Sequence, residues 1–446
     1  MVQKEVIENE SYQEHLKILR DAIEKKSGKT VNELYYEKQK RLWDAIEMRQ
    51  PDKVPVILGG TFFAAKYAGL PYSSAYYDPI NWKKAYTKMI ADFEPDTWGT
   101  AGAMSSGAAL DTLQTKNILW PGGTLPPDVP EQTLDGEYLR EDEYDLFLED
   151  TTGFLLRCYL PRIQGALEPL AKLPSLSDSP MMMMMFPIFA SMLNTPEYQE
   201  VGRALQKAGQ EQAEHLQALG NMQEDMAYLG FPPMSERGPF LGPAFDNMAN
   251  AYRGWKGIVK DMYRRPDKLI AALEKINRGQ LSSIHPADTS KPGPKLASAG
   301  AIHRGSDDFL SKKQWEQFYW PTWKRSMMKA IEAGYIVDIF AEGYCENRFE
   351  YFLDLPKGKV LIRFTDTDMF KAKEILGEHV SLMGSVPMDL LQIGSPSEVD
   401  EYCRKLIEIC GKNGGYILRT CTDYLQDAKI ENIKAMMDAV KKYGPY

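Results

Sequence analysis

The C-terminal half of the chain alternates short apolar runs with helical patterns, and this rhythm limits the fold more than any other feature. The runs are rich in β-branched and aromatic residues, as expected of strands that are buried on both faces. Segments with apolar residues at helical spacing separate them. The sequence therefore predicts successive βα units and a parallel sheet. The runs are YIVDIF (335–340), KVLIRF (359–364), VSLMG (380–384) and GYILRT (415–420).

Four further segments complete a set of about eight strand candidates. They are KVPVILGGT (53–61), PDTWGTAG (95–102), MSERGPF (234–240) and the start of LASAGAIHRGSDDFLS (296–311). This number predicts a (β/α)8 TIM barrel. We expect a helical N-terminal extension over 1–50 and a barrel over 51–446 with a helical insertion around 139–230. An open doubly wound sheet is the alternative, but no glycine-rich dinucleotide fingerprint follows any strand.

Composition excludes several classes of protein. The net charge of the 446 residues is −9, and no Lys/Arg cluster follows the pattern of a nucleic-acid-binding surface. The longest apolar run, MMMMMFPIFASML (181–193), is too short to span a membrane and contains a proline. The charged N-terminus has no apolar core of a signal peptide. Five cysteines without CxxC spacing indicate a reducing compartment. We expect a cytoplasmic protein that binds neither nucleic acid nor membranes.

Polar residues that end the apolar runs form the candidate site, because a parallel barrel carries its active site at the C-terminal ends of its strands. Glu342 directly follows a buried strand, and Gly343 beside it allows close approach of backbone or ligand, so this carboxylate needs a partner. His303 alone among the five histidines follows a strand; it is either a ligand or proton carrier, or a structural histidine. The remaining candidates are Thr61, Arg237, Arg304, Arg363, Asp366 and Cys421.

Several polar residues have a simpler structural interpretation. Asp368 is placed to cap the helix that follows it. Arg363 could form an ion pair that lines the barrel. His15 and His215 lie in charged helical contexts, where we expect them to be solvated.

Glutamate, histidine and cysteine side chains are all known zinc ligands. His303, Glu342 and Cys421 are far apart in sequence, so they form a zinc site only if the fold brings the strand ends together.

The pieces RQPDKVPV, HRGSDDFLS, EGYCENRFEYFLDLPKG, TDTDMFKAKEILGEHVSLMGSVP and GGYILRT together resemble the uroporphyrinogen decarboxylase superfamily. The resemblance is best over 296–446, with a weaker match at 40–62. It implies a (β/α)8 barrel and one of two activities. One is cofactor-free decarboxylation of a porphyrinogen. The other is zinc-dependent methyl transfer to or from a corrinoid protein.

The chain departs from both patterns. The decarboxylase holds substrate propionates with an arginine-rich N-terminal motif, whereas VILGGTFFAAKYAGLPY (56–72) has no arginine. The thiol-activating methyltransferases carry a His-x-Cys pair where this chain has Phe340 and Glu342, and a further cysteine near Cys421. Demethylation of a methoxy compound needs an acid at the departing oxygen, supplied by zinc on His303, Glu342 and Cys421 or by a protonated Glu342.

The resemblance thus implies a methyltransferase that moves a methyl group from a small, methoxylated aromatic donor to the Co(I) corrinoid of a partner protein. Glu342 and His303 are its predicted catalytic residues, and Arg304, Arg237, Arg363, Asp366 and Thr61 its predicted substrate contacts. The alternatives are a lyase that releases CO2 from an aromatic or pyrrolic acid, held by Arg237, Arg304 and Arg363, and a non-catalytic binding barrel. The sequence leaves open whether the chain forms a homodimer.

Overall fold

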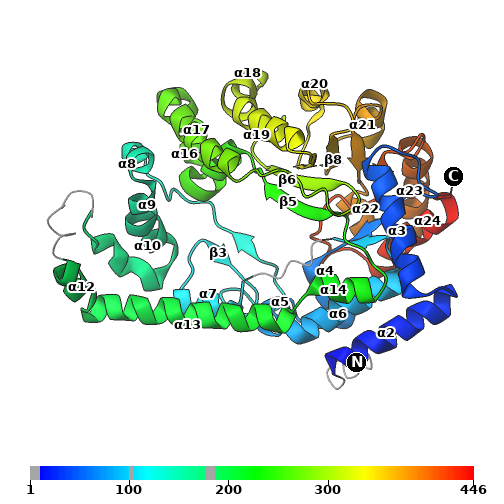
Figure 1. The fold of residues 1–446 in the computed structure, drawn as a ribbon, viewed down its shortest axis with the longest axis horizontal. Helices are drawn as coiled ribbons and strands as arrows, with labels where there is room; N and C mark the ends of the chain where they lie inside the picture. The colour runs from blue at the N-terminus through cyan, green and yellow to red at the C-terminus, as the bar shows by residue number, and fades with distance from the viewer. Residues whose placement is uncertain (1–10, 100–104, 176–185, 446) are drawn as a thin grey trace.

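A computed structural model describes residues 11–99, 105–175 and 186–445. Its centre is a parallel sheet with helices packed around it (Figure 1). Six strands pair in the order β10-β9-β8-β7-β6-β5, and β1 pairs with β2 in parallel. A bridge between Val56 and Leu418 joins these two groups of strands. The parallel strands are β1 (Ile57–Leu58), β2 (Thr97–Trp98), β5 (Glu236–Phe240), β6 (Lys295–Ile302), β7 (Ile336–Ala341), β8 (Val360–Phe364), β9 (Ser381–Met383) and β10 (Tyr416–Ile417).

Each of the strand segments expected from the sequence overlaps one of these parallel strands. The sheet also curls so that its two ends approach each other. The hydroxyl of Thr97 in β2 donates to the carbonyl oxygen of Pro232, just before β5, at 2.6 Å. No backbone ladder joins β2 to β5 within the described ranges. The protein is therefore an α/β fold whose parallel strands follow the order of a TIM barrel. Separately, β3 (Ile118–Leu119) and β4 (Gln132–Thr133) form a short antiparallel pair.

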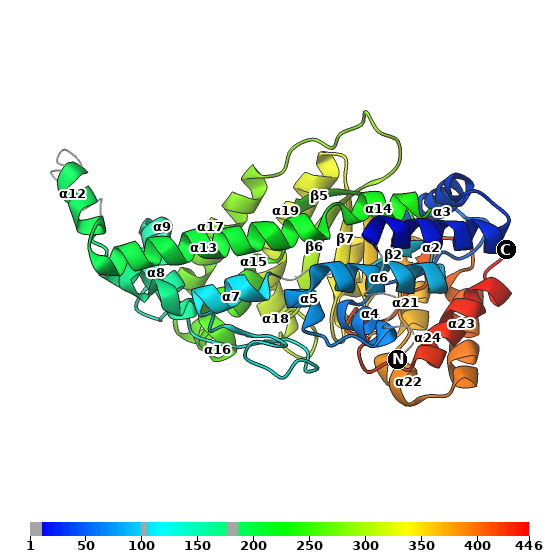
Figure 2. The ribbon, with the colours of Figure 1, turned by 90° about the horizontal axis from the view of Figure 1, so that it is seen from below.

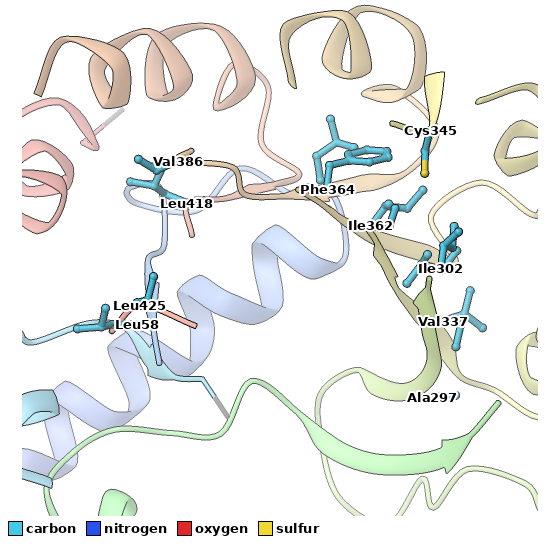
Figure 3. Close-up of a cluster of buried hydrophobic side chains, with 14 of the residues drawn as sticks. Leu58, Ala297, Ile302, Val337, Cys345, Ile362, Phe364, Val386, Leu418 and Leu425 are labelled. Atoms are coloured by element: carbon cyan, nitrogen blue, oxygen red, sulfur yellow. The ribbon is translucent and has the colours of Figure 1, made fainter. Parts of the chain in front are cut away.

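Side chains alternate between the two faces of the curled sheet, as the two-residue period of a strand requires. On β7, Ile336 joins a small apolar cluster in the interior, whereas Val337 packs in the large core between strands and helices. Figure 3 shows part of that outer core, including Ile362 and Phe364 of β8. We call this interior cluster the floor. It comprises Ala45, Ile46, Ile57, Leu296, Ile336, Leu361, Met383 and Ile417.

Helices precede, interrupt and follow the strands. Before β1 lie α2 (Tyr12–Ser27) and α3 (Val31–Ile46), and between β1 and β2 lie α4 (Thr61–Ala68), α5 (Ser74–Tyr77) and α6 (Pro79–Phe93). Between β2 and β5 come α7 (Gly107–Leu113), α8 (Tyr144–Glu149), α9 (Thr151–Phe154), η1 (Leu155–Tyr159), α10 (Leu160–Ile163), η2 (Gly165–Lys172), α12 (Phe186–Leu193), α13 (Pro196–Leu219) and α14 (Met222–Tyr228). The helices α8 to α12 lie at one end of the molecule, far from α21 to α24 (Figure 1, Figure 2).

The remaining helices connect the later strands. They are α15 (Ala244–Asn247), η3 (Met248–Arg253), α16 (Gly254–Arg264), α17 (Pro266–Ser282), α18 (Lys312–Gln314), η4 (Trp315–Tyr319), α19 (Trp320–Glu332), η5 (Glu346–Arg348), α20 (Phe349–Leu353), α21 (Met369–Leu376), α22 (Met388–Ile393), α23 (Pro396–Cys410) and α24 (Ile430–Tyr443). No helix of the described part of the chain has both the length and the apolar character to cross a membrane. The division into an extension, a barrel and an insertion stays a prediction.

The expected cap at Asp368 is present. Its carboxylate accepts hydrogen bonds from the backbone N–H groups of Phe370 and Lys371 at the start of α21. Such a cap satisfies donors that a helix leaves free at its first turn. Asp368 therefore has a structural role, as its sequence context indicates.

Candidate functional site

His303 and Glu342 face each other where two neighbouring strands end. The last register partners of β6 and β7 are Ile302 and Ala341, so the residues that follow lie side by side. Nδ1 of His303 is hydrogen-bonded to the carboxylate of Glu342 in an ion pair. The side chains remain 47% and 33% exposed, respectively, so a ligand at the mouth of the curled sheet can reach both.

The loop after β7 fixes Glu342 in this position. Gly343 has φ 73°, a conformation that glycine adopts without the cost a Cβ would impose. Its N–H donates to the hydroxyl of Thr365, after β8, at 2.8 Å. The N–H of Cys345 donates to the hydroxyl of Thr367 at 3.0 Å. The turn is therefore held by side chains of the next strand end.

The hydrogen bond that the imidazole donates to Glu342 raises the pKa of His303 above its ordinary value, even though burial acts in the opposite direction. A histidine whose pKa rises toward neutrality keeps its proton over more of the physiological pH range. The pair can therefore hold a proton at the mouth of the site and release it to a basic atom of a bound ligand.

A buried carboxylate, Asp246 of α15, holds the backbone beneath this pair. It accepts hydrogen bonds from the N–H groups of His303 and Arg304, both at 2.9 Å, and from the hydroxyl of Tyr319 at 2.7 Å. Burial raises the pKa of Asp246. Sequence reasoning missed this residue; the only signal is a single carboxylate within the apolar stretch GPAFDNMA.

The interior between the floor and the mouth is charged. Alternation along the strands directs Asp338 of β7, Arg363 of β8 and Arg419 after β10 to the same side as the floor residues. Arg363 and Arg419 both pair with Asp423, with closest contacts of 3.0 and 2.7 Å. Although burial opposes it, the two arginines hold the pKa of Asp423 well below its usual range. Barrel interiors are usually filled by branched apolar side chains, so this charged layer is unusual.

Two glycines make room for this layer. A Cβ on Gly59, after β1, would lie 2.9 Å from the Cα of Gly99, after β2, and 3.1 Å from Oδ1 of Asp423. A Cβ on Gly99 would lie 3.1 Å from Nη2 of Arg419. The close approach of β1 and β2 beside the ion pairs therefore requires glycine at both positions.

Arg363, predicted as a substrate contact and alternatively as a barrel-lining ion-pair residue, forms an ion pair with Asp423, and its role as a substrate contact stays a prediction. Besides Asp423, its guanidinium donates to the carbonyl oxygens of Thr420 and Cys421 and lies 4.4 Å from the ring of Phe340. Burial lowers the pKa of Arg363 to about 10.

The other predicted substrate contacts lie in different surroundings. Arg304 donates from Nε to Asn250 at 3.3 Å, and its guanidinium lies 5.1 Å from the ring of Phe309. Thr61 is buried at the start of α4, where its carbonyl oxygen accepts from the indole of Trp82. The side chain of Arg237 lies outside the described residues. Their roles as substrate contacts stay predictions.

Cys421 and Asp366 line a separate hollow of about 470 Å³ at the ends of β8, β9 and β10, together with Ser385. Burial raises the pKa of the Cys421 thiol, which disfavours the thiolate that binds zinc. Within the described ranges, no three His, Cys, Asp or Glu side chains lie close enough together to hold a metal ion. The side chains as placed therefore do not fit the expected zinc site. His303 and Glu342 come together, and Cys421 is not grouped with them.

Tyr424 adds a contact that the sequence did not indicate. Its hydroxyl donates to Glu131 at 2.9 Å, and the hydroxyl of Tyr76 donates to the same carboxylate. Burial, Glu131 and more weakly Glu342 raise the pKa of Tyr424. The segment that contains Glu131 is thus tied to the residues around Glu342.

Comparisons with known proteins agree with the fold. Residues 238–443 match the uroporphyrinogen decarboxylase (URO-D) family. A solved structure of a methyltransferase from Methanosarcina mazei is similar in fold, with a TM-score of 0.50 at 15% sequence identity over 91% of this chain and 98% of that chain. A search of curated proteins finds no significant match.

Proposed function

From the match of residues 238–443 to the uroporphyrinogen decarboxylase family, we propose that the chain is a member of that superfamily and a corrinoid-dependent methyltransferase. Its substrate is a small methoxylated aromatic compound, and its methyl acceptor is the corrinoid of a partner protein. The observation that carries the proposal is the His303–Glu342 pair at the ends of β6 and β7. The likeness in fold to a methyltransferase supports it.

Cleavage of an aryl methyl ether leaves negative charge on the oxygen atom. A Co(I) corrinoid, when the partner presents it, supplies the nucleophile for the methyl carbon. The protein's part is to donate a proton to the departing oxygen, which makes the phenol the leaving group. His303 carries that proton, and Glu342 keeps the imidazolium favourable until transfer. The sequence left two sources for this acid, zinc on His303, Glu342 and Cys421 or a protonated Glu342, and the pair with His303 as the donor is a third.

Asp246 orients the donor without touching the substrate. Its two backbone hydrogen bonds fix the chain at His303 and Arg304, which sets the direction of the imidazole. Catalytic groups held by fixed neighbours lose little entropy at the moment of reaction. The expected zinc ligands His303, Glu342 and Cys421 do not come together among the described residues, and the proton transfer described here does not require zinc.

The test combines the purified protein, a free Co(I) corrinoid and a series of methoxylated aromatics, and measures the phenol formed. Glu342→Gln and His303→Gln are expected to lower the rate by about 10²–10⁴-fold, the usual contribution of general acid catalysis. Glu350→Gln is the matched control, because Glu350 forms an exposed surface ion pair with Lys312. Release of CO2 from an aromatic acid without corrinoid would support the lyase instead.

A further inference from the structure

A second cavity lies in the interior of the curled sheet, and the proposed methyl transfer does not use it. It has a volume of about 690 Å³, within the range of small-molecule sites. One wall carries the charged side chains of Asp338 and Arg419. The remaining walls carry the apolar side chains of Trp98, Met234 and Phe240 as well as the polar ones of Asn221, Gln223, Ser235 and Ser298.

The Asp338 carboxylate has no hydrogen-bond donor among the described residues. Neither Arg363 nor Arg419 forms an ion pair with it, although both act on it electrostatically. Asp338 is only partly buried and lines the cavity, so its oxygens are available to accept a hydrogen bond from a bound molecule. This burial still raises the pKa of Asp338 to about 6.

Arg419 has spare donor capacity on the same wall. Its Nη2 atom is committed to Asp423, but Nη1 contacts only the sulfur of Met383 at 3.6 Å, and sulfur is a weak acceptor. Its Nε is buried without a partner. A guanidinium with free N–H groups and a carboxylate with free lone pairs thus line one cavity without touching each other.

We propose that this cavity binds a small neutral molecule with a hydroxyl group on an apolar, aromatic body. The hydroxyl donates to Asp338 and accepts from Arg419, so it supplies what each group lacks. At neutral pH the two arginines balance the two carboxylates Asp338 and Asp423, so a neutral ligand matches the charge of the layer. The apolar side chains of the walls take the ring.

Asp338 lies on the same face of β7 as Glu342, four residues earlier. This corresponds to about 13 Å along the strand, so the cavity is a site deeper in the interior than the His303–Glu342 pair. The assignment does not depend on methyl transfer, because it concerns binding in the absence of corrinoid.

Calorimetric titration of the full chain with phenol and with toluene tests this assignment, because the two rings differ by a hydroxyl in place of a methyl group. Phenol is expected to bind at least about tenfold more tightly, the usual value of a hydrogen bond to a charged group. In Asp338→Asn this preference is expected to fall by about tenfold, since the acceptor loses its charge. Asp438→Asn is the matched control, because Asp438 forms a surface ion pair with Lys434 outside the cavity, and it should leave the preference unchanged.

Equal affinities of the wild-type protein for phenol and toluene would overturn the proposal, and this comparison needs no variant. A preference for phenol that persists in Asp338→Asn would place the hydroxyl elsewhere and would also overturn it. Loss of methyl transfer with retained phenol binding, or the reverse, separates this inference from the proposed function.

Discussion

Nδ1 of His303 is hydrogen-bonded to the carboxylate of Glu342, although 39 positions separate the two residues in the numbering. The contact exists because parallel strands β6 and β7 end in register at Ile302 and Ala341. The strand ends thus assemble a proton-holding pair at the mouth of the curled sheet, and Asp246 fixes the backbone on which one partner sits.

The first prediction concerns the charge state of His303. The pKa of its imidazole is expected to lie above the ordinary histidine value in the wild-type protein, and to fall in Glu342→Gln, because the hydrogen-bonded carboxylate raises it. Histidine NMR titration measures both. An unchanged pKa in the variant would show that Glu342 does not stabilise the imidazolium.

Asp246→Asn tests the backbone support. The asparagine amide has one acceptor oxygen where the carboxylate has two, so the backbone N–H of His303 or of Arg304 loses its acceptor. We expect a loss of about 1–3 kcal/mol in the free energy of unfolding, measured by urea denaturation. Tyr319→Phe removes one donor to the same carboxylate and should cost less. Equal stability of Asp246→Asn and the wild type would contradict this role.

Asp338 makes stability depend on pH. Its pKa in the folded protein is about 6, above the 3.8 of a free aspartate. Between these values the unfolded chain releases the proton while the folded protein keeps it, so stability falls as pH rises and the penalty is constant above about pH 6. Asp338→Asn should therefore gain on the order of 2–3 kcal/mol at pH 8 and almost nothing near pH 4, measured by denaturation at both pH values. A gain of equal size at both would exclude this origin.

A pair of glycine variants tests the close approach of β1 and β2. Gly59→Ala brings a Cβ to within 2.9 Å of the Gly99 backbone and is expected to cost about 1–3 kcal/mol. Gly209→Ala, in α13, meets nothing within 4 Å and should gain about 1 kcal/mol from helix propensity. Thermal unfolding of both variants measures the difference. A neutral Gly59→Ala would mean that the two strand ends can move apart freely.

The number of possible ligands that lie together predicts how much zinc the protein binds. Because only His303 and Glu342 come together among the described residues, we expect less than one zinc per chain by mass spectrometry after chelation and dialysis. About one zinc per chain, lost in both Glu342→Ala and His303→Ala, would restore the zinc site that the resemblance implies.

Much of the fold could be predicted from the sequence, because buried strands and amphipathic helices have characteristic local patterns of apolar residues. The runs around β7 and β8 needed only their own residues to be recognised. How the sheet curls between β2 and β5 was not accessible, since it depends on contacts such as Thr97 to Pro232.

That His303 and Glu342 lie together could be predicted because strand position alone decides it, whereas side chains placed by tertiary contacts could not be predicted. His303 and Glu342 met because register follows from strand order. Asp246 sits in a short helix without any pattern of its own. His15 and His215, expected to be solvated, are buried; Nε2 of His15 lies 3.0 Å from the hydroxyl of Thr87. Both histidines lie among charged residues in sequence, so the local composition did not indicate that they are buried.

The most direct test of the proposed function follows the methyl group itself. A methoxylated aromatic with a deuterated methyl group is incubated with the wild-type protein and a Co(I) corrinoid, and both products are analysed by mass spectrometry. The account predicts that the label appears on the corrinoid in step with release of the phenol, and that Glu342→Gln slows both together. Label that stays on the aromatic compound, across a broad series of donors, would contradict it.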